Sequence, residues 1–546
     1  MASDLSLTGK HWHLPEEYCE PLNASHVLAR LLSAREIHPD APASLIAPSV
    51  FPDMERATGR IREAVTRGET IGIFGDYDCD GITAVAQLVR FFRRQNIEPW
   101  VRLPHRVRDG YGLTEDIVQE CIDAKISVLI TADTGIGAVQ EIAKLSDAGI
   151  DVIVTDHHHV HEEVPPAYAI VHPALSSHPL PHPSGSGVAF KLVYALEEES
   201  WDGMEEDLSL AMFGTVADLV ELRGENKALT ILGLQALEKI SNSPIATLRE
   251  RCRSSESPLT STDIAFRIAP RINAAGRISE PDIALRALLD GGESIAELDA
   301  LNEHRQELSR ELYTQAIDAI EDTESAPLLA SVSGQYPHGI VGLIAGKLTE
   351  KYGKPSLIAN TDGRTCTASL RSPALYNVTE GLGRCSDLLI SFGGHAQAAG
   401  CTFAIENFDA IKQKLSEDIA THVDTSLLVP TLKIDAVMDA KHVTIDFAEK
   451  LKMLEPYGQG NPEPLFLFPN VSLTDARACG ADNTHLQARI FGVKCIGFGM
   501  AHLAEESEKF DVVARIGIDG WNGRRVPQLI LQDLGVALCD REMLKC

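Results

Sequence analysis

Three aspartates alternate within residues 75–81, GDYDCDG, directly after the apolar run TIGIF. Carboxylates this close together repel one another unless a positive charge lies among them. A divalent cation supplies that charge, and oxygen ligands suit Mg²⁺ or Mn²⁺. The same pattern resembles the start of an EF-hand, but the twelfth position counted from Asp76 is Gln87 rather than the required glutamate. The pattern therefore favours another kind of metal site at Asp76, Asp78 and Asp80, with a solvated acidic turn as the alternative.

Further potential ligands follow later in the chain. Asp133 ends the run LITAD, where a lone aspartate more often caps a helix or forms a turn. Asp156 precedes three histidines after DVIVT, and a histidine beside an aspartate fits a metal ligand with its orienting carboxylate. Asp218 lies in the apolar segment FGTVADLVEL, where a carboxylate is costly unless it meets a charge or a metal. Together these residues could hold two cations ~3.5–4 Å apart, as in-line phosphoryl displacement requires.

The elements that must position these residues alternate between two patterns. Short apolar runs that end in polar residues predict buried strands, whereas the segments between them have helical spacing. The runs are TIGIFGDYD, SVLITADT, DVIVTDHHH and YAIVHPAL. Strand and helix in alternation predict an α/β fold with a doubly wound parallel sheet. Ligands in such sheets gather at the carboxyl ends of the strands, where the acidic and histidine clusters fall.

The remainder of the chain divides by composition. A Pro-rich lead-in precedes the α/β region, a mainly helical block follows it, and one long polar helix then leads to a second, smaller α/β region. Closely spaced strands with Gly turns near the end predict a small OB-like β-barrel. The predicted units are residues 1–60, 61–295, 296–325, 326–424 and 425–546.

Bulk composition narrows the class of protein. Lys and Arg number 49 against 78 Asp and Glu, for a net charge of −29, so the whole surface does not coat nucleic acid. A local basic path remains compatible with this count. The eleven cysteines form no CxxC pair, which argues against a zinc ribbon. The start of the sequence lacks a signal-peptide pattern and no apolar run is long enough to span a membrane, so we expect a cytoplasmic protein without membrane contact.

These motifs resemble the DHH/DHHA1 phosphoesterase superfamily and, within it, the RecJ-type exonucleases. GDYDCDGITA, TADTGI, TDHHHV and GTVADLVEL resemble the first four motifs in order, and RINAAGRIS resembles a further one. YPHGIVGLIAGKLTEKYGKPSLIA and SFGGHAQAAGCTF resemble the DHHA1 domain, and EPYGQGNPEPLF resembles the entry to the OB domain. The likeness covers roughly residues 60–535, so residues 61–295 would be the DHH catalytic domain and residues 326–424 the DHHA1 domain.

The resemblance also implies roles for individual residues. Asp133 would bridge two metal ions, Asp156 would orient His157, and His158 would lie beside the reacting phosphate, so that His158, Asp133 and Asp156 form the catalytic set. The implied metal ligands are Asp76, Asp78, Asp80, Asp133, His157 and Asp218. The implied substrate-binding residues are Arg106, Tyr111, Arg271, Asn273, Arg277, His338, Ser369, Arg371 and His395.

By the same resemblance the function would be 5′-to-3′ hydrolysis of single-stranded DNA to 5′-mononucleotides, in recombination and repair. Two Mn²⁺ or Mg²⁺ ions would be the cofactors, and single-strand binding protein and a RecQ-type helicase would be partners. The alternatives are a DHH enzyme for short oligonucleotides and an inactive DHH scaffold. Two residues depart from the family pattern: Cys79 replaces an alanine, and His172 stands where asparagine is expected.

Overall fold

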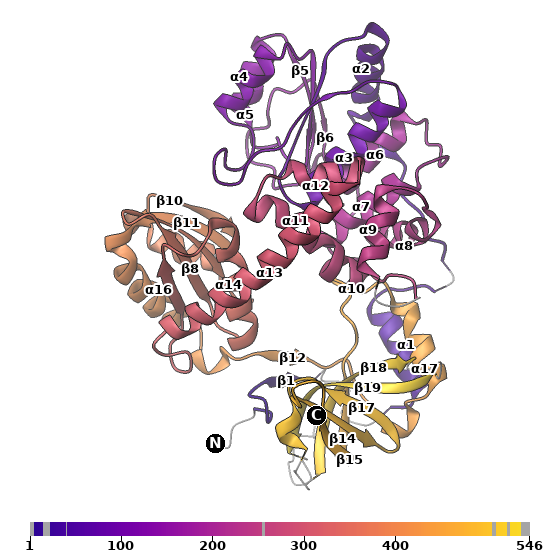
Figure 1. The fold of residues 1–546 in the computed structure, drawn as a ribbon, viewed down its shortest axis with the longest axis vertical. Coiled ribbons are helices and arrows are strands. Elements are labelled where there is room, and N and C mark those ends of the chain that lie inside the picture. Colours follow the sequence, from indigo (N-terminus) through magenta and orange to yellow (C-terminus); the bar gives the residue numbers. More distant parts are fainter. Residues whose placement is uncertain are drawn as a thin grey trace.

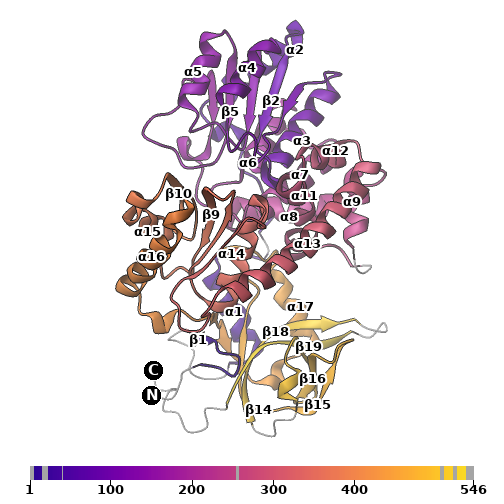
Figure 2. The same ribbon diagram turned by 60° about the vertical axis from the view of Figure 1, so that its left-hand side comes forward.

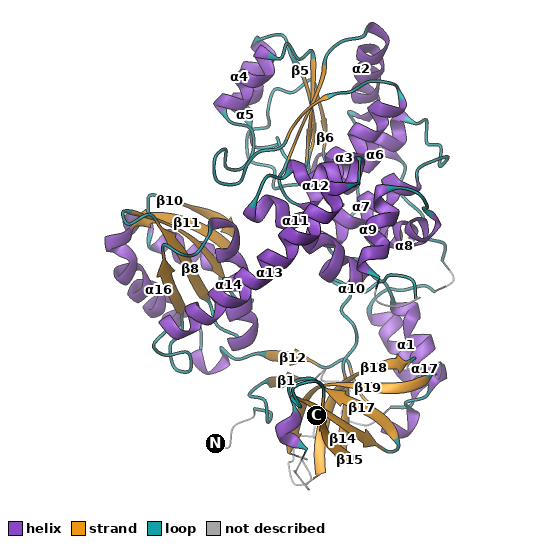
Figure 3. Cartoon of the chain, in the orientation of Figure 1, coloured by secondary structure: helices purple, strands orange, loops and turns teal. Residues whose placement is uncertain are grey.

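Three folded units follow one another along the chain, and one long helix joins the first two (Figure 1, Figure 3). The computed structural model describes residues 5–14, 22–39, 41–253, 257–504, 509–520 and 525–536. In Figure 2 the second unit lies beside the first and the third lies at the opposite end of the molecule from the sheet of the first. Each unit has its own apolar core.

The first unit is built on a parallel five-stranded sheet in the order β3-β2-β4-β5-β6. Nearly all residues of its three central strands are buried, as expected for strands covered on both faces. The four apolar runs of the sequence are strands of this one sheet, which confirms the predicted doubly wound fold. The strands are β2 (Ile71–Gly75), β3 (Trp100–Arg102), β4 (Val128–Ala132), β5 (Asp151–Thr155) and β6 (Ala169–Val171).

Helices cover both faces of this sheet because alternate strand residues point to opposite sides. Ile73 and Ile130 belong to the larger apolar cluster, and Phe74 and Leu129 belong to a separate one on the other face. The larger cluster includes α2 (Met54–Arg67), α3 (Cys79–Arg94) and α6 (Gly185–Leu196). The other includes α4 (Glu115–Asp123) and α5 (Val139–Asp147).

A helical block completes the first unit and continues into the connecting helix. Its main helices are α7 (Glu205–Ala217), α8 (Gly224–Lys239), α9 (Pro244–Cys252), α11 (Ala269–Ile278) and α12 (Asp282–Leu289). The connecting helix is α13 (Glu293–Ala319), which starts three residues before the predicted segment and ends six residues before its end. It ends early because Ile320 adopts an extended conformation ahead of a polar segment.

The second unit has a mixed sheet in the order β10-β11-β9-β8-β7. Only β7 and β8 are parallel, and the remaining pairs are antiparallel. Helices α13 and α14 (His338–Tyr352) share one apolar cluster, whereas α15 (Val378–Arg384) and α16 (Phe408–His422) belong to the other. The strands are β7 (Leu329–Ser333), β8 (Ser356–Thr361), β9 (Thr365–Arg371), β10 (Ser391–His395) and β11 (Ala398–Ala404).

The third unit is a seven-stranded sheet that encloses one apolar core together with α17 (Ile445–Leu451). Its strand order is β13-β14-β18-β19-β17-β16-β15. The strands are β13 (Ala436–Val437), β14 (Phe466–Ser472), β15 (Thr474–Cys479), β16 (His485–Ile490), β17 (Val493–Gly497), β18 (Lys509–Asp519) and β19 (Val526–Val536). The predicted β-rich unit near the end of the chain is therefore present.

The beginning of the chain packs on this third unit. Strand β1 (His11–His13) pairs in parallel with β12 (Thr431–Lys433), and Trp12 donates a hydrogen bond from Nε1 to Asp533 Oδ2 at 2.7 Å. Helix α1 (Ala24–Ala34) contributes Val27 and Leu31 to the core of that unit. The segment expected as a lead-in to the catalytic unit thus stabilises the opposite end of the molecule. Among the described residues, no helix has both the length and the apolar content needed to cross a membrane.

Candidate metal centre and phosphate-binding residues

The acidic loop joins β2 to α3 and is held by its own backbone. Asp78 is the N-cap of α3, and its Oδ1 accepts hydrogen bonds from Asp80 N at 3.0 Å and Gly81 N at 3.1 Å. Gly81 is required by a close approach, because a Cβ atom there would lie 2.7 Å from the backbone of Asp76. Helix capping and a missing side chain therefore turn three alternating carboxylates toward the same edge of the sheet.

Asn273, from α11, fixes the same loop from outside. Its Oδ1 accepts a hydrogen bond from Cys79 N at 2.9 Å. Asn273 was predicted to bind substrate; the structure shows its amide against the acidic loop, and the substrate contact stays a prediction. The thiol of Cys79 is buried and faces Phe213 O at 3.9 Å. A small side chain is therefore accommodated at this departure from the family pattern.

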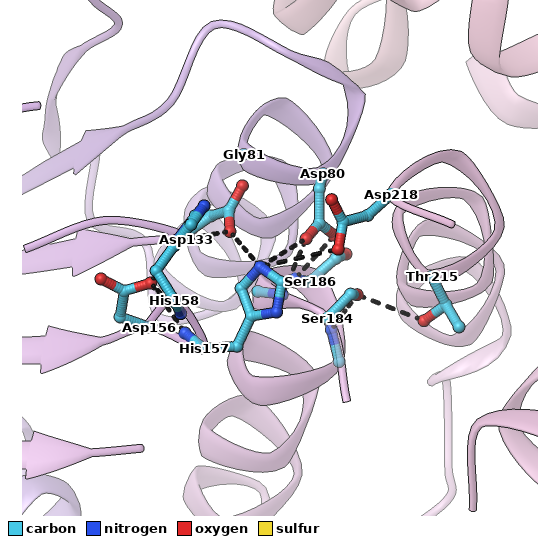
Figure 4. A network of polar contacts seen from close by, with 12 residues as sticks. Asp80, Gly81, Asp133, Asp156, His157, His158, Ser184, Ser186, Thr215 and Asp218 are labelled. Carbon is cyan, nitrogen blue, oxygen red and sulfur yellow. Dashed lines mark hydrogen bonds and ion pairs between the residues drawn. The ribbon is translucent and has the colours of Figure 1, made fainter. Parts of the chain in front are cut away.

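The carboxylate of Asp80, a residue of α3, is buried against the first residues of α6. Its Oδ2 accepts a hydrogen bond from Gly185 N at 2.7 Å, and its Oδ1 accepts one from Ser186 N at 2.9 Å (Figure 4). These two amides were not singled out from the sequence, although the run PSGSG ahead of a helix is typical of an anion-binding helix start. Helix α7 packs so closely against Asp80 that a Cβ atom placed at Gly214 would lie 2.3 Å from Asp80 Oδ1.

Asp133 ends β4 in a left-handed backbone conformation, with a φ of 62°. A non-glycine residue adopts this conformation only at a cost, and such strain concentrates at functional sites. Its Oδ1 is buried and has no hydrogen-bond partner among the described residues. His157 Nε2 is also buried and without a hydrogen-bond partner there, and lies 3.1 Å from Asp133 Oδ1. Two buried polar atoms that face each other without satisfying each other are typical of a metal site.

Two further carboxylates surround the same imidazole nitrogen (Figure 4). Asp218 Oδ2 lies 3.6 Å and Asp80 Oδ2 lies 3.8 Å from His157 Nε2. Asp218 caps the carboxyl end of α7, so the expectation that every ligand follows a strand was wrong for this residue. Packing of α7 against α3 and α6 brings it to the sheet edge.

The ligand atoms fall into groups that each lie within 4.8 Å of one another. One group is Asp80, His157 and Asp218, and another is Asp76, Asp78 and Asp133. These two groups share no residue, although Asp133 and His157 also meet in a third group with His158. All six residues predicted as metal ligands therefore converge, and they divide into two potential ion positions.

Burial and mutual repulsion make the carboxylates of this centre poor acids. Burial, followed by the charge of Asp78, raises the pKa of Asp76 to about 8 and that of Asp80 to about 7. Burial and the charge of Asp80 raise the pKa of Asp218 to about 9, and the pKa of Asp133 is raised for the same reasons. Such a cluster takes up protons unless cations neutralise it, which fits a site for divalent metals.

Asp156 contacts both His157 and His158. Its Oδ1 lies 2.8 Å from His158 Nδ1 and accepts hydrogen bonds from the backbone amides of both histidines, so the predicted orienting role toward His157 stays a prediction. The tight turn after β5 places the second histidine over the carboxylate. Although burial opposes it, this hydrogen bond and the charge of Asp156 raise the pKa of His158 to about 9. His158 is therefore a cation at neutral pH.

Tyr111 and His172 complete the surroundings of this histidine. The Tyr111 hydroxyl lies 3.3 Å from His158 Nε2, and the two rings meet edge to face. His172 Nε2 lies 2.9 Å from His158 O. The side chain at the second departure from the family pattern therefore contacts the backbone of the turn after β5. In contrast to His158, His157 has a pKa that burial and the charge of His158 lower to about 4, which favours the neutral ligand form.

Arginines approach this centre from the loop after β3, from α11 and from the second unit. The guanidinium of Arg106 lies 4.0 Å above the ring of Tyr77, and Arg277 donates to Gly339 O at 3.1 Å. Ser369 and Arg371 lie together under α14, within 3.5 Å and 3.1 Å of a Cβ placed at Gly342. His338 begins α14, and His395 ends the exposed strand β10.

Arg271 is the predicted substrate residue that the structure turns away from this group. Its Nε donates to Asp299 Oδ1 at 2.8 Å on α13, so its charge is already neutralised. Arg271 and Arg277 flank the same small-residue run, but α11 presents them on different faces because six positions are about one and two thirds turns of helix. Arg271 is therefore paired with a carboxylate, whereas Arg277 has no carboxylate partner among the described residues, and the substrate contacts of both stay predictions.

The fold and the site define a class of protein. Family models match three segments: "DHH family, N-terminal domain" over residues 70–215, "DHHA1 domain" over residues 325–421 and "RecJ OB domain" over residues 434–533. An acidic edge on a parallel sheet, joined by a helix to a smaller α/β unit, is therefore the DHH/DHHA1 arrangement. Similarity over nearly the whole chain assigns the protein to one family within this class.

The chain belongs to the RecJ family. It is 34% identical over 504 residues to the single-stranded-DNA-specific exonuclease RecJ of Thermus thermophilus, which covers 91% of this chain and 72% of the relative. It is 33% identical over 523 residues to RecJ of Bacillus subtilis, covering 92% of this chain and 66% of the relative, so it spans about two thirds of that protein. The crystal structure of Thermus thermophilus RecJ in complex with Mn²⁺ superposes with a TM-score of 0.81 at 30% identity, covering 96% of this chain and 79% of that one.

Proposed function

We propose that this protein is a metal-dependent exonuclease that hydrolyses single-stranded DNA from its 5′ end to 5′-mononucleotides. The single observation that carries the proposal is the pair of disjoint ligand groups around Asp133 Oδ1 and His157 Nε2, two buried atoms that have no hydrogen-bond partner in the part of the chain that the structure describes. The relatives named as single-stranded-DNA-specific exonucleases support the substrate and the reaction. Recombination and repair would be the setting, with single-strand binding protein and a RecQ-type helicase as partners.

The proposed cofactors are two divalent cations, Mn²⁺ or Mg²⁺. Asp80, His157 and Asp218 would hold one, and Asp76, Asp78 and Asp133 the other, and Asp133 Oδ1 lies 3.1 Å from His157 Nε2 of the first group. The carboxylate-rich set suits either metal, and crystal structures of Thermus thermophilus RecJ with Mn²⁺ and with Mg²⁺ support the choice. Bound divalent cations supply Lewis acidity, which lowers the pKa of water and neutralises charge on a phosphate.

The chain's own residues would orient the substrate and manage one proton. Arg277 and Arg371 would hold phosphate oxygens through planar guanidinium groups, which bind such anions bidentately. His158, kept protonated by Asp156, would donate a hydrogen bond from Nε2, the ring nitrogen beside the Tyr111 hydroxyl, to the phosphate that is attacked. Breaking the bond between phosphorus and the 3′ oxygen then releases a nucleotide that keeps its 5′ phosphate.

The test is degradation of single-stranded and duplex DNA labelled at the 5′ or the 3′ end, with Mn²⁺, Mg²⁺ or EDTA. We expect immediate release of mononucleotide from the 5′ label of single strands, in either metal and not in EDTA. Cleavage confined to dinucleotides would assign the protein to the short-substrate enzymes. Absence of cleavage in either metal would support the inactive scaffold instead.

A further inference from the structure

A cluster of arginines comes from both of the first two units and from the connecting helix between them. Its members are Arg106, Arg277, Arg305 and Arg371, contributed by the loop after β3, by α11, by α13 and by β9. Among the described residues, none of the four forms an ion pair with a carboxylate. The hydrogen bonds that their side chains donate go to neutral oxygens, namely those of Gly276, Gly339, Asn302 and Leu370.

Arg305 is the member of this cluster that the sequence motifs did not indicate. Its NH2 donates to Asn302 Oδ1 at 2.9 Å, and Asn302 is itself buried one turn earlier on α13. Its Nε atom is buried and has no hydrogen-bond partner among the described residues. One edge of the guanidinium is therefore anchored by the helix, and a buried N–H is left without an acceptor.

The cations of this cluster act on one another. After burial, the nearby charges of Arg106, Arg305 and Arg371 lower the pKa of Arg277 to about 10. Burial alone lowers the pKa of Arg305, because no carboxylate offsets it. Converging, partly desolvated cations are costly unless an anion joins them. Arg271 differs from these four arginines, because it forms an ion pair with Asp299 on α13.

We propose that Arg305 is a phosphate-binding residue of this enzyme, which contacts the bound strand together with Arg277 and Arg371. The ligand is a phosphate group of a nucleic acid, and Asn302 positions the guanidinium to receive it. The inference rests on the proposed function for the identity of the strand. Helix α13 thereby contributes directly to substrate binding, in addition to joining the two units.

Binding without cleavage tests this assignment. Arg305→Gln, Arg305→Lys and the wild type are compared for affinity to a 5′-phosphorylated single strand in EDTA over a range of salt concentrations. Each phosphate neutralised contributes about −0.7 to the slope of log affinity against log salt for single strands. We expect Arg305→Gln to bind about tenfold more weakly and to lose about one phosphate from that slope, as removal of one charge-assisted hydrogen-bond donor implies. Arg305→Lys should keep the slope and recover only part of the affinity, because lysine binds as a point charge.

The matched control is Arg286→Gln, which removes an exposed arginine on α12 outside the cluster. It should leave both affinity and slope unchanged. An unchanged slope in a folded Arg305→Gln variant overturns the assignment, and so does a loss of affinity that Arg286→Gln reproduces. If Arg305→Gln does not fold, the slope of Arg305→Lys decides, and a reduced slope there overturns the assignment.

Measurements of kcat and KM distinguish the role of Arg305 from the proposed function of the protein. With Mn²⁺ present, we expect Arg305→Gln to raise KM about tenfold and to change kcat much less, because it removes a binding contact outside the metal ligands. A wild-type protein that binds single strands with the expected slope but never cleaves them refutes the exonuclease and leaves Arg305 as an anion-binding residue. A variant that cleaves with unchanged KM refutes only the role of Arg305.

Discussion

The metal centre and the arginine cluster are opposite in charge and in origin. The first gathers five carboxylates and an imidazole within a single unit, from the ends of strands and from two helices that pack on them. The second gathers guanidiniums from both α/β units and from the helix between them. Among the described residues, Asp133 Oδ1 and His157 Nε2 in the first and Arg305 Nε in the second are buried without a hydrogen-bond partner, so each site is suited to an ion of the opposite sign.

This difference indicates how the two sites respond to change. The acidic centre is fixed by local structure, so it should form whenever the first unit folds. The arginine cluster requires α13 and the second unit to lie where they do, so its affinity depends on how the units are arranged. Loss of a metal ligand should therefore affect the chemical step, and loss of an arginine should mainly affect binding.

The largest expected effect comes from Asp133→Asn. The amide keeps the shape of the side chain but removes the charge that faces both ion positions. We expect kcat with Mn²⁺ to fall by about 10³-fold or more, because a lost ligand forfeits several kcal/mol of charge stabilisation. Asp202→Asn, an exposed aspartate in the loop before α7, is the control and should retain activity. Undiminished cleavage by folded Asp133→Asn would contradict the metal assignment.

The next effect compares the two arginines that flank one run of small residues. Arg277→Gln should lower kcat/KM by about 10²-fold, since charge-assisted hydrogen bonds to phosphate contribute about 1.5–3 kcal/mol. Arg271→Gln should lower it much less, because the half-buried guanidinium of Arg271 is already paired with Asp299. Steady-state kinetics on one oligonucleotide measures both variants. Equal losses would show that the pairing of Arg271 with Asp299 does not exist in solution.

A smaller effect is expected from Asp156→Asn. This variant removes the charge that holds His158 protonated and weakens the turn that presents both histidines. We expect kcat to fall about tenfold with little change in metal affinity, as is typical when a residue that orients another is lost. The decrease in kcat is measured at saturating Mn²⁺, and metal affinity is measured separately by titration. A loss of activity that excess Mn²⁺ restores would place Asp156 among the metal ligands instead.

The smallest effect is a change of stability with pH in EDTA. The folded-state pKa values of Asp80, Asp76 and Asp218 are raised to about 7, 8 and 9, above the ordinary value of 3.8. The folded protein therefore binds more protons than the unfolded chain between about pH 4 and pH 9, and its stability falls as pH rises through that window. We expect Tm to drop by several degrees, roughly 3–8 °C, from pH 5 to pH 8 in EDTA.

Metal should reverse that trend, because bound cations keep the same carboxylates ionised. With Mn²⁺ present, Tm should be higher at pH 8 than in EDTA, and the decrease between pH 5 and pH 8 should shrink. Asp218→Asn removes one titrating group and should reduce the decrease seen in EDTA. An increase of Tm with pH in EDTA would be incompatible with buried, mutually repelling carboxylates.

The parallel sheet and most residues of the metal centre could be predicted from the sequence alone. Apolar runs ending in Asp76, Asp133 and Asp156 are strands, and parallel strands end at one edge, so nearness in space followed from a local pattern. Composition and closely spaced strand patterns predicted the second α/β unit and the β-rich third unit, and motif resemblance then supplied the family. These features depend on periodicity and on short spacings, which a single chain displays directly.

Which groups contact each other across long distances in the sequence depends on the tertiary structure. It turned Arg271 to Asp299, placed Asn273 against the acidic loop, and brought Arg305 to Arg277. It also seated Trp12 on Asp533, more than 500 residues away in the chain. The physical reason is that helical spacing determines which face of a helix a residue occupies, whereas its partner depends on how separate elements pack.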